Sequence, residues 1–166
     1  MESHRFPPAD YTVWNQFFPS PITARPAQLE DTQPLHQLCY SERPFLRFQH
    51  HFHHCLKQQA RGRGIWLALQ HRRRLIGAGH LITYSHEGEL ADLFVHTNYR
   101  SQGIGSAMIH LLIHIAQQQH LNALEIGVLA TNHRAYHLYQ RLGFTLDRQI
   151  QLNNGHTAFI LRQDII

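Results

Sequence analysis

The stretch from Tyr99 to Ala116, YRSQGIGSAMIHLLIHIA, decides most of what the sequence predicts about the fold. An arginine and two spaced glycines follow a short apolar run and open directly into a helical pattern. Because Gly103 and Gly105 carry no side chain, the backbone can turn tightly and its N–H groups can approach an anion closely. The helix then places the positive end of its dipole behind them. This arrangement predicts a loop that binds a pyrophosphate.

The helix after the loop has one apolar stripe, formed by residues at helical spacing: Ile104, Met108, Leu111, Leu112 and Ile115. Two common phosphate-binding motifs do not fit the loop. A dinucleotide fingerprint would need a third glycine at Met108, and a P-loop would need a Gly-Lys-Ser/Thr sequence. The pyrophosphate therefore belongs to another class of ligand.

Two motifs resemble those of the GNAT superfamily of N-acetyltransferases. Arg100 to Gly105, RSQGIG, resembles its coenzyme A pyrophosphate loop, Gln/Arg-x-x-Gly-x-Gly/Ala. After an expected strand over 123–129, the segment ATNHRAYHLYQRLGF resembles the pattern Asn-x-x-Ala-x-x-x-Tyr-x-x-x-Gly-Phe. Its matching residues are Asn132, Ala135, Tyr139, Gly143 and Phe144. Asn132 and Gly143 also suit the two ends of a helix, and Tyr139 also suits a core. The likeness spans residues 22–162 and is strongest over 89–144.

The resemblance implies an α/β fold with a mixed, mostly antiparallel central sheet flanked by helices. The expected order is strand, two helices, three strands, helix, strand, helix and two strands. The expected strands cover 22–27, 65–70, 75–84, 89–96, 123–129, 144–152 and 156–162. Expected helices run from residue 31 or 32 to about 40, over 45–60, after the glycine loop, and after Asn132. Residues 1–20, rich in proline and aromatics, form an extension that we expect to pack across the domain or a partner chain, and 21–166 form one domain.

The same resemblance implies acetyl-coenzyme A as cosubstrate. The residues expected to bind it are Leu93, Phe94, Val95, Arg100, Ser101, Gln102, Gly103, Ile104, Gly105, Ser106, Asn132, Ala135 and Tyr139. In the family, backbone groups of the strand before the loop hold the pantetheine and polarise the thioester. The motif tyrosine stands near the sulfur as general acid.

Acetyl transfer to an amine also needs a group that accepts the amine proton. The strand before the loop offers Glu89, where family members often carry such a glutamate, and Asp92 as its rival. In a regular strand, residues three apart point to opposite faces. The family tends to have a β-bulge here, which could bring both carboxylates to one cleft. Solvent or a histidine stays open as the base.

We therefore expect an N-acetyltransferase that moves the acetyl group directly to a primary amine of a small molecule or protein N-terminus. Cys39 and Cys55 lie outside both motifs, which favours direct transfer over an acetyl-cysteine intermediate, and we expect both to be free thiols. Two alternatives stay open: a non-catalytic acyl-coenzyme A-binding regulatory module, and a metal-responsive interaction protein. The chain has only 11 acidic residues, which argues against a polycationic acceptor.

The composition limits which classes of partner we expect. The formal charge of +4 suits coenzyme A, and the one dense basic run, Arg72 to Arg74, has the sequence of a hairpin turn rather than of a nucleic-acid site. We expect no membrane contact and a cytoplasmic protein, because the chain lacks an apolar run of about 18 residues and a signal-peptide pattern. A homodimer stays open. Of the 16 histidines, His50, His51, His53 and His54 cluster, and we interpret them as a polar helix face with no metal site.

Overall fold

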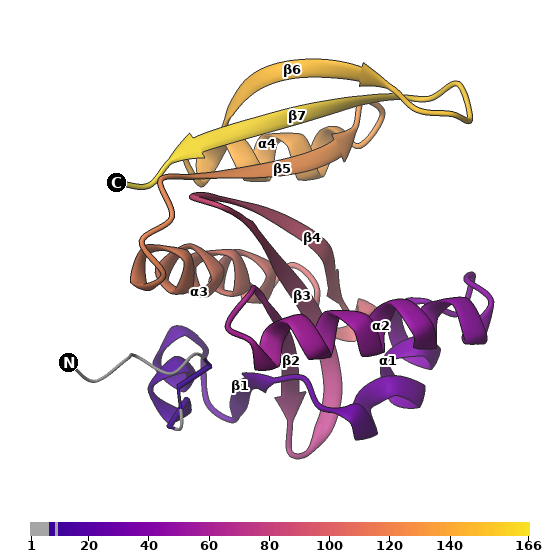
Figure 1. The fold of residues 1–166 in the computed structure, drawn as a ribbon, viewed down its shortest axis with the longest axis vertical. Helices are drawn as coiled ribbons and strands as arrows, with labels where there is room; N and C mark the ends of the chain where they lie inside the picture. Colours follow the sequence, from indigo (N-terminus) through magenta and orange to yellow (C-terminus); the bar gives the residue numbers. More distant parts are fainter. Residues whose placement is uncertain (1–6, 9) are drawn as a thin grey trace.

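The computed structural model describes residues 7–8 and 10–166. Its centre is one seven-stranded sheet in the order β1-β2-β3-β4-β5-β7-β6 (Figure 1). The strands are β1 (Ile22–Pro26), β2 (Ile65–His71), β3 (Arg74–Tyr84), β4 (Glu87–Val95), β5 (Ala123–Leu129), β6 (Thr145–Gln151) and β7 (Thr157–Asp164). All neighbours are antiparallel except β4 and β5, which are parallel. This confirms the expected fold class and element order.

Four α-helices pack on the sheet: α1 (Thr32–Cys39), α2 (Phe45–Ala60), α3 (Ile104–Gln118) and α4 (His133–Arg141). The apolar stripe of α3 is buried against one face of the sheet, where α4 also packs. On the opposite face, α1 and α2 bury Leu35, Phe48 and Phe52 against Trp66 of β2. Since these are two separate apolar clusters, the sheet is covered on both faces in its first half.

The N-terminal segment belongs to the α3 side of the molecule. The short 3-10 helix η1 (Thr12–Phe17) contacts β1 and α3. Trp14 is fully buried in the same core as the α3 stripe, and Asn15 Oδ1 accepts a 2.9 Å hydrogen bond from the N–H of Ala24. The expected packing of residues 1–20 across the domain is therefore found for 11–18, while residues 1–6 and 9 lie outside the described residues.

The parallel pair β4–β5 opens along its length. Only Glu87 to Leu90 pair with Ala123 to Ile126, after which the two strands diverge (Figure 1). The later residues of β5 pair with β7 alone, and those of β4 with β3 alone. Strand ends without a neighbour leave backbone N–H and C=O groups free for a ligand.

A β-bulge interrupts β4 beyond this point. The register between β3 and β4 shifts between Ala78 and His80, and Asp92 takes a left-handed φ of 52°. Aspartate tolerates this conformation better than most residues. Two residues of β4 then oppose one of β3, which turns the Asp92 side chain toward α1 and α2.

Candidate active site

The glycine loop leaves a row of backbone donors unused. Ser101 and Gly103 both have left-handed φ angles, 61° and 79°, in front of the 15-residue helix α3. Within the described part of the chain, no N–H group of residues 101–106 donates a hydrogen bond to a protein atom. A Cβ added at Gly103 would meet nothing within 4 Å, and one at Gly105 only Val95 Cγ2 at 3.9 Å. The space in front of these donors is open, so the loop fits a pyrophosphate.

Two arginines hold the loop in place. Arg100 Nε donates a 2.8 Å hydrogen bond to the carbonyl of Val95, and its guanidinium lies over the Phe94 ring. Arg134 Nη2, from the first turn of α4, donates to Ser101 Oγ at 2.7 Å. Sequence reasoning missed Arg134, which adds a positive charge beside the loop. Its position two residues after Asn132, at the start of the second motif, was the signal that could have found it.

The expected pantetheine-binding residues lie on the free part of β4. Leu93, Phe94 and Val95 follow the last β4–β5 pair at Leu90 and Ile126. They are partly exposed, and Leu93 and Val95 pack against the α3-side core. The backbone of this segment can therefore hydrogen-bond an extended ligand lying between β4 and β5.

The second motif lies across the gap on α4. Asn132 Oδ1 accepts the N–H of Ala135 at 3.1 Å, so its side chain caps the helix. Tyr139 packs against the α3-side core, with its ring centroid 6.5 Å from that of Phe144. Burial raises the pKa of the Tyr139 hydroxyl, which has no hydrogen-bond partner among the described residues. The hydroxyl is therefore protonated and free to donate.

Asp92 is surrounded by side chains from the end of α1, the loop between α1 and α2, and β3. Its backbone carbonyl accepts the Tyr40 hydroxyl at 3.0 Å, and Arg43 Nη2 donates to Oδ1 at 3.3 Å. The other oxygen, Oδ2, lies 3.9 Å from Nδ1 of His80. Burial raises the pKa of Asp92, but His80 and Arg43 outweigh that effect and hold its pKa below the usual value. Asp92 is thus a partly buried carboxylate that stays ionised.

Glu89 lies further back on β4, where that strand still pairs with β5. It lines a cavity of about 370 Å³ with Glu87 and Glu125, and Tyr84 donates to its Oε2 at 3.2 Å. The bulge does place Asp92 on the α1/α2 side of the sheet, the side that Tyr84 and Glu89 also face. Even so, Asp92 does not line the cavity that holds Glu89.

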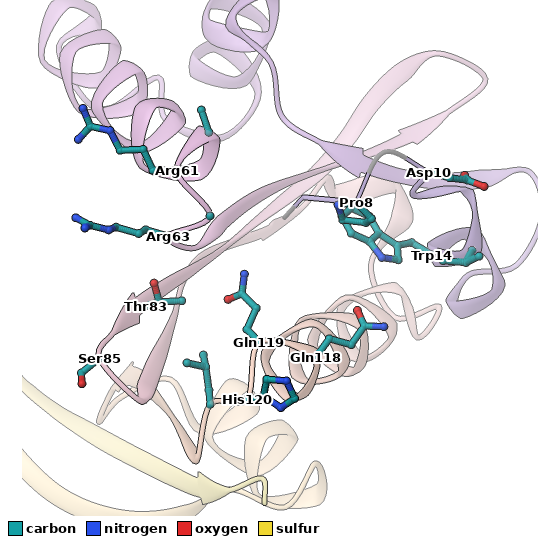
Figure 2. A pocket seen from close by; sticks show the side chains of 14 residues that line it. Pro8, Asp10, Trp14, Arg61, Arg63, Thr83, Ser85, Gln118, Gln119 and His120 are labelled. Atoms are coloured by element: carbon teal, nitrogen blue, oxygen red, sulfur yellow. The ribbon is translucent and has the colours of Figure 1, made fainter. Parts of the chain in front are cut away.

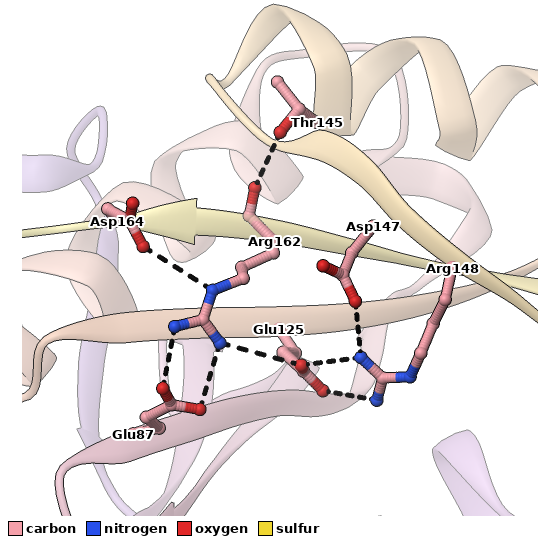
Figure 3. A network of polar contacts seen from close by, with 7 residues as sticks. All are labelled: Glu87, Glu125, Thr145, Asp147, Arg148, Arg162 and Asp164. Carbon is pink, nitrogen blue, oxygen red and sulfur yellow. Dashed lines mark hydrogen bonds and ion pairs between the residues drawn. The ribbon is translucent and has the colours of Figure 1, made fainter.

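An ion-pair network covers the sheet beside that cavity (Figure 3). Arg162 of β7 bonds both carboxylate oxygens of Glu87, at 3.0 and 2.7 Å, and thereby spans the β4–β5 seam. Arg148 of β6 bonds both oxygens of Glu125, at 2.8 and 2.9 Å. Asp147 and Asp164 also contact these two guanidinium groups. The fold therefore gathers carboxylates that the sequence keeps apart, and they outnumber the cations among them.

Two of the clustered histidines of α2 contact different side chains. His53 Nε2 lies 3.0 Å from Thr32 Oγ1, and His51 Nε2 lies 3.7 Å from Cys55 Sγ. Among the described residues, no three His, Cys, Asp or Glu side chains are arranged to hold a metal ion. Both cysteines are free. Burial raises the pKa of Cys39 to about 12 and of Cys55 to about 11, and the nearby charge of Asp92 adds to both shifts.

A large cavity lies at the end of α3 opposite the glycine loop (Figure 2). It holds about 1280 Å³ between η1, the end of α2 and residues 118–121. Arg61 and Arg63 extend over one side, and Gln118 and Gln119 over the other. Because neither motif contributes a residue to it, this cavity is separate from the candidate active site. No helix in the described range is long and apolar enough to cross a membrane.

Comparison with known proteins agrees with this geometry. A model of the acetyltransferase (GNAT) family matches residues 28–144 of the 166. The chain belongs to this family. This match confirms the resemblance seen in the two motifs. Enzymes of the GNAT family use acetyl-coenzyme A.

Individual relatives of this GNAT chain differ in their acceptors. A thialysine N-epsilon-acetyltransferase of Bos taurus is 41% identical over 54 residues, 32% of each chain, so the match spans about a third of that relative. The ribosomal-protein-S18-alanine N-acetyltransferase of Escherichia coli has a TM-score of 0.72 at 20% identity, over 87% of this chain and 94% of the other. A chimeric spermidine N-acetyltransferase from Vibrio cholerae and hSSAT has a TM-score of 0.74 at 17% identity, over 88% and 96%. These two structures share the fold.

Proposed function

We propose that this protein is an N-acetyltransferase that transfers the acetyl group of acetyl-coenzyme A directly to a primary amine. The observation that carries the proposal is the row of unused N–H groups over residues 101–106, at the start of α3 and beside the free end of β4. These donors, together with Arg134, would hold the pyrophosphate. The backbone of Leu93 to Val95 would hold the pantetheine and orient the thioester.

The transfer needs two proton transfers that side chains of this chain can supply. The acceptor amine must lose a proton to attack the carbonyl carbon, and we assign that proton to Asp92, with Glu89 as the second candidate. Asp92 is favoured because it directly precedes the segment that would hold the thioester, whereas Glu89 precedes the point where β4 and β5 diverge. As the C–S bond breaks, the Tyr139 hydroxyl would donate a proton to the departing thiolate.

The acceptor would enter from the α1/α2 side, where Asp92 faces α1 and α2. The carboxylates around Glu89 favour an amine that carries further positive charge over a neutral one. This revises the expectation from the low acidic content, because four carboxylates of β4 to β7 lie around two arginines and Glu89 lines the adjoining cavity. We favour a small amine as the acceptor, and the acceptor screen below also includes peptides with a free N-terminus.

Direct transfer also agrees with the cysteines. Their raised pKa values keep both thiols protonated at neutral pH, and a protonated thiol is a poor nucleophile. The alternative of a non-catalytic acyl-coenzyme A-binding module makes a different prediction: acetyl-coenzyme A would bind, but no amine in an acceptor library would release free thiol. A screen of amino acids, polyamines and N-terminal peptides by thiol release separates the two functions.

The cofactor site is tested by Gly105→Val. Gly105 lies in the first turn of α3 without a left-handed φ, so the added side chain should leave the fold intact and block the anion space. We expect calorimetry to show at least a tenfold loss of acetyl-coenzyme A affinity, and the same for Gly103→Val.

Gly155→Val is the matched control for Gly103→Val. Gly155 has a φ of 82° and open space around it, as Gly103 has, but it lies in the β6–β7 turn. The backbone strain is therefore equal in both variants, and only the Gly103 variant should lose affinity. Unchanged affinity in both loop variants would remove the pyrophosphate assignment.

A further inference from the structure

His80 is a buried polar residue that no step above uses. It lies on β3 with only 6% of its surface exposed, and its ring stacks on Trp66 with the centroids 4.4 Å apart and the planes at 14°. Its Nδ1 is buried and has no hydrogen-bond partner among the described residues. An unpartnered polar atom in a core is costly, so this position requires an explanation.

The carboxylate oxygen nearest to Nδ1 also has no hydrogen-bond partner among the described residues, although the Asp92 side chain is partly exposed. Asp92 Oδ2 lies 3.9 Å away, too far for a hydrogen bond, and Oδ1 receives only the 3.3 Å contact from Arg43. Two lone pairs that face each other repel, and one proton between them would satisfy both. The pair is therefore arranged as a site for a single proton.

The neighbours of this pair bear on where that proton would lie. Arg43, from the loop between α1 and α2, is the one full cation in contact with Asp92. From α2, His51 and Cys55 face the pair, and from α1 and its end, Cys39 and Tyr40. Burial raises the pKa values of Tyr40 and both thiols and lowers that of His51, so all four are neutral at pH 7.

We propose that His80 is a positioning residue that acts through Asp92 and stores the proton that the acceptor amine loses. The N–H bond of the amine breaks and an O–H bond forms at Asp92. That O–H bond then breaks as the same proton passes from the carboxyl group to Nδ1 of His80, so that Asp92 is a carboxylate again and His80 is an imidazolium. The imidazolium then donates a hydrogen bond to the Asp92 carboxylate and holds it in place. After the product leaves, His80 releases the proton to solvent. This proposal rests on the proposed acetyl transfer, but its test needs no acceptor.

Trp66 supplies the measurement, because a protonated imidazole stacked on an indole quenches its fluorescence. The chain has two tryptophans, so Trp14→Phe leaves Trp66 as the single reporter. We expect its emission to fall as the pH is lowered through the histidine range. The fall should disappear in His80→Asn, which keeps a polar group near the Nδ1 position but cannot titrate. In Asp92→Asn it should move to lower pH, because the carboxylate that stabilises the imidazolium is gone.

His51→Asn is the matched control, since the His51 ring also lies near Trp66, with the centroids 6.0 Å apart. The fluorescence fall should persist in that variant. If it persists in His80→Asn instead, or if Asp92→Asn leaves its midpoint unchanged, the proposal is overturned. Circular dichroism identifies any variant that has not folded, and His80→Gln then replaces His80→Asn. Calorimetry with acetyl-coenzyme A on the same samples shows separately whether the acetyltransferase assignment fails.

Discussion

At the scale of single residues, the two carboxylates of β4 differ in what surrounds them. Asp92 is held by a bulge among Tyr40, Arg43 and His80, whereas Glu89 bonds only Tyr84. A general base contributes most when the acceptor is largely ammonium, which is at low pH. The identity of the base is therefore visible in the pH dependence of the rate.

For Asp92→Asn we expect the rate at neutral pH to fall by roughly 10²-fold or more and to recover in part at high pH, where free amine is abundant. Because the folded pKa of Asp92 is below its ordinary value, Asp92 stays ionised at neutral and mildly acid pH. The acid limb of the wild-type profile must then come from another group. Glu89→Gln is the paired variant, and a large fall there with an unchanged Asp92→Asn profile would reverse the assignment.

Tyr139→Phe tests the general acid. We expect the turnover rate to fall by roughly 10²-fold with little change in acetyl-coenzyme A affinity. The fold should tolerate the change, because the hydroxyl has no partner among the described residues and the ring keeps its packing on the core. Steady-state rates and calorimetry on the same sample separate the two effects. A fully active Phe variant would show that the hydroxyl has no catalytic role.

At the scale of elements, the β2–β3 hairpin has unfavourable turn residues. Arg72 and Arg73 have left-handed φ angles of 48° and 68°, a conformation that favours Asn and Gly. The double change Arg72→Asn with Arg73→Gly should therefore raise the free energy of unfolding by about 1 kcal/mol. Urea denaturation measures it.

The control for the hairpin is Arg74→Gly, which removes one positive charge of the same arginine run, from the first residue of β3. Glycine in a strand is unfavourable, so this variant should be less stable than the wild type. A gain of stability in Arg74→Gly would attribute the effect to charge repulsion among the arginines rather than to the backbone of the turn.

At the scale of the whole molecule, the point where β4 and β5 diverge lies between two halves of the sheet. One face of the sheet is covered differently in each half. Helices α1 and α2 cover β2 to β4 on one face, and the same face of β5 to β7 carries the ion-pair network instead (Figures 1 and 3). The cofactor loop lies on one side of this seam and the carboxylates on the other. The acetyl donor and a cationic acceptor can thus approach the seam from opposite faces.

The order of the elements follows from the sequence alone, because each strand and helix has its own local pattern. The apolar period of α3, the glycines before it and the cap at Asn132 are all determined by neighbours in the chain. The arginine turn was found in the same way. These features identified the family and the expected cofactor site without any long-range information.

Only the tertiary structure decides which distant side chains meet. Tyr40, Arg43 and His80 reach Asp92 across as many as 52 positions of chain, and Arg162 reaches Glu87 across 75. No local pattern encodes such contacts, since they depend on strand register, on the bulge at Asp92 and on how α1 and α2 pack on the sheet. For the same physical reason the sequence named Glu89 and Asp92 as rivals, and only their surroundings in the fold distinguish them.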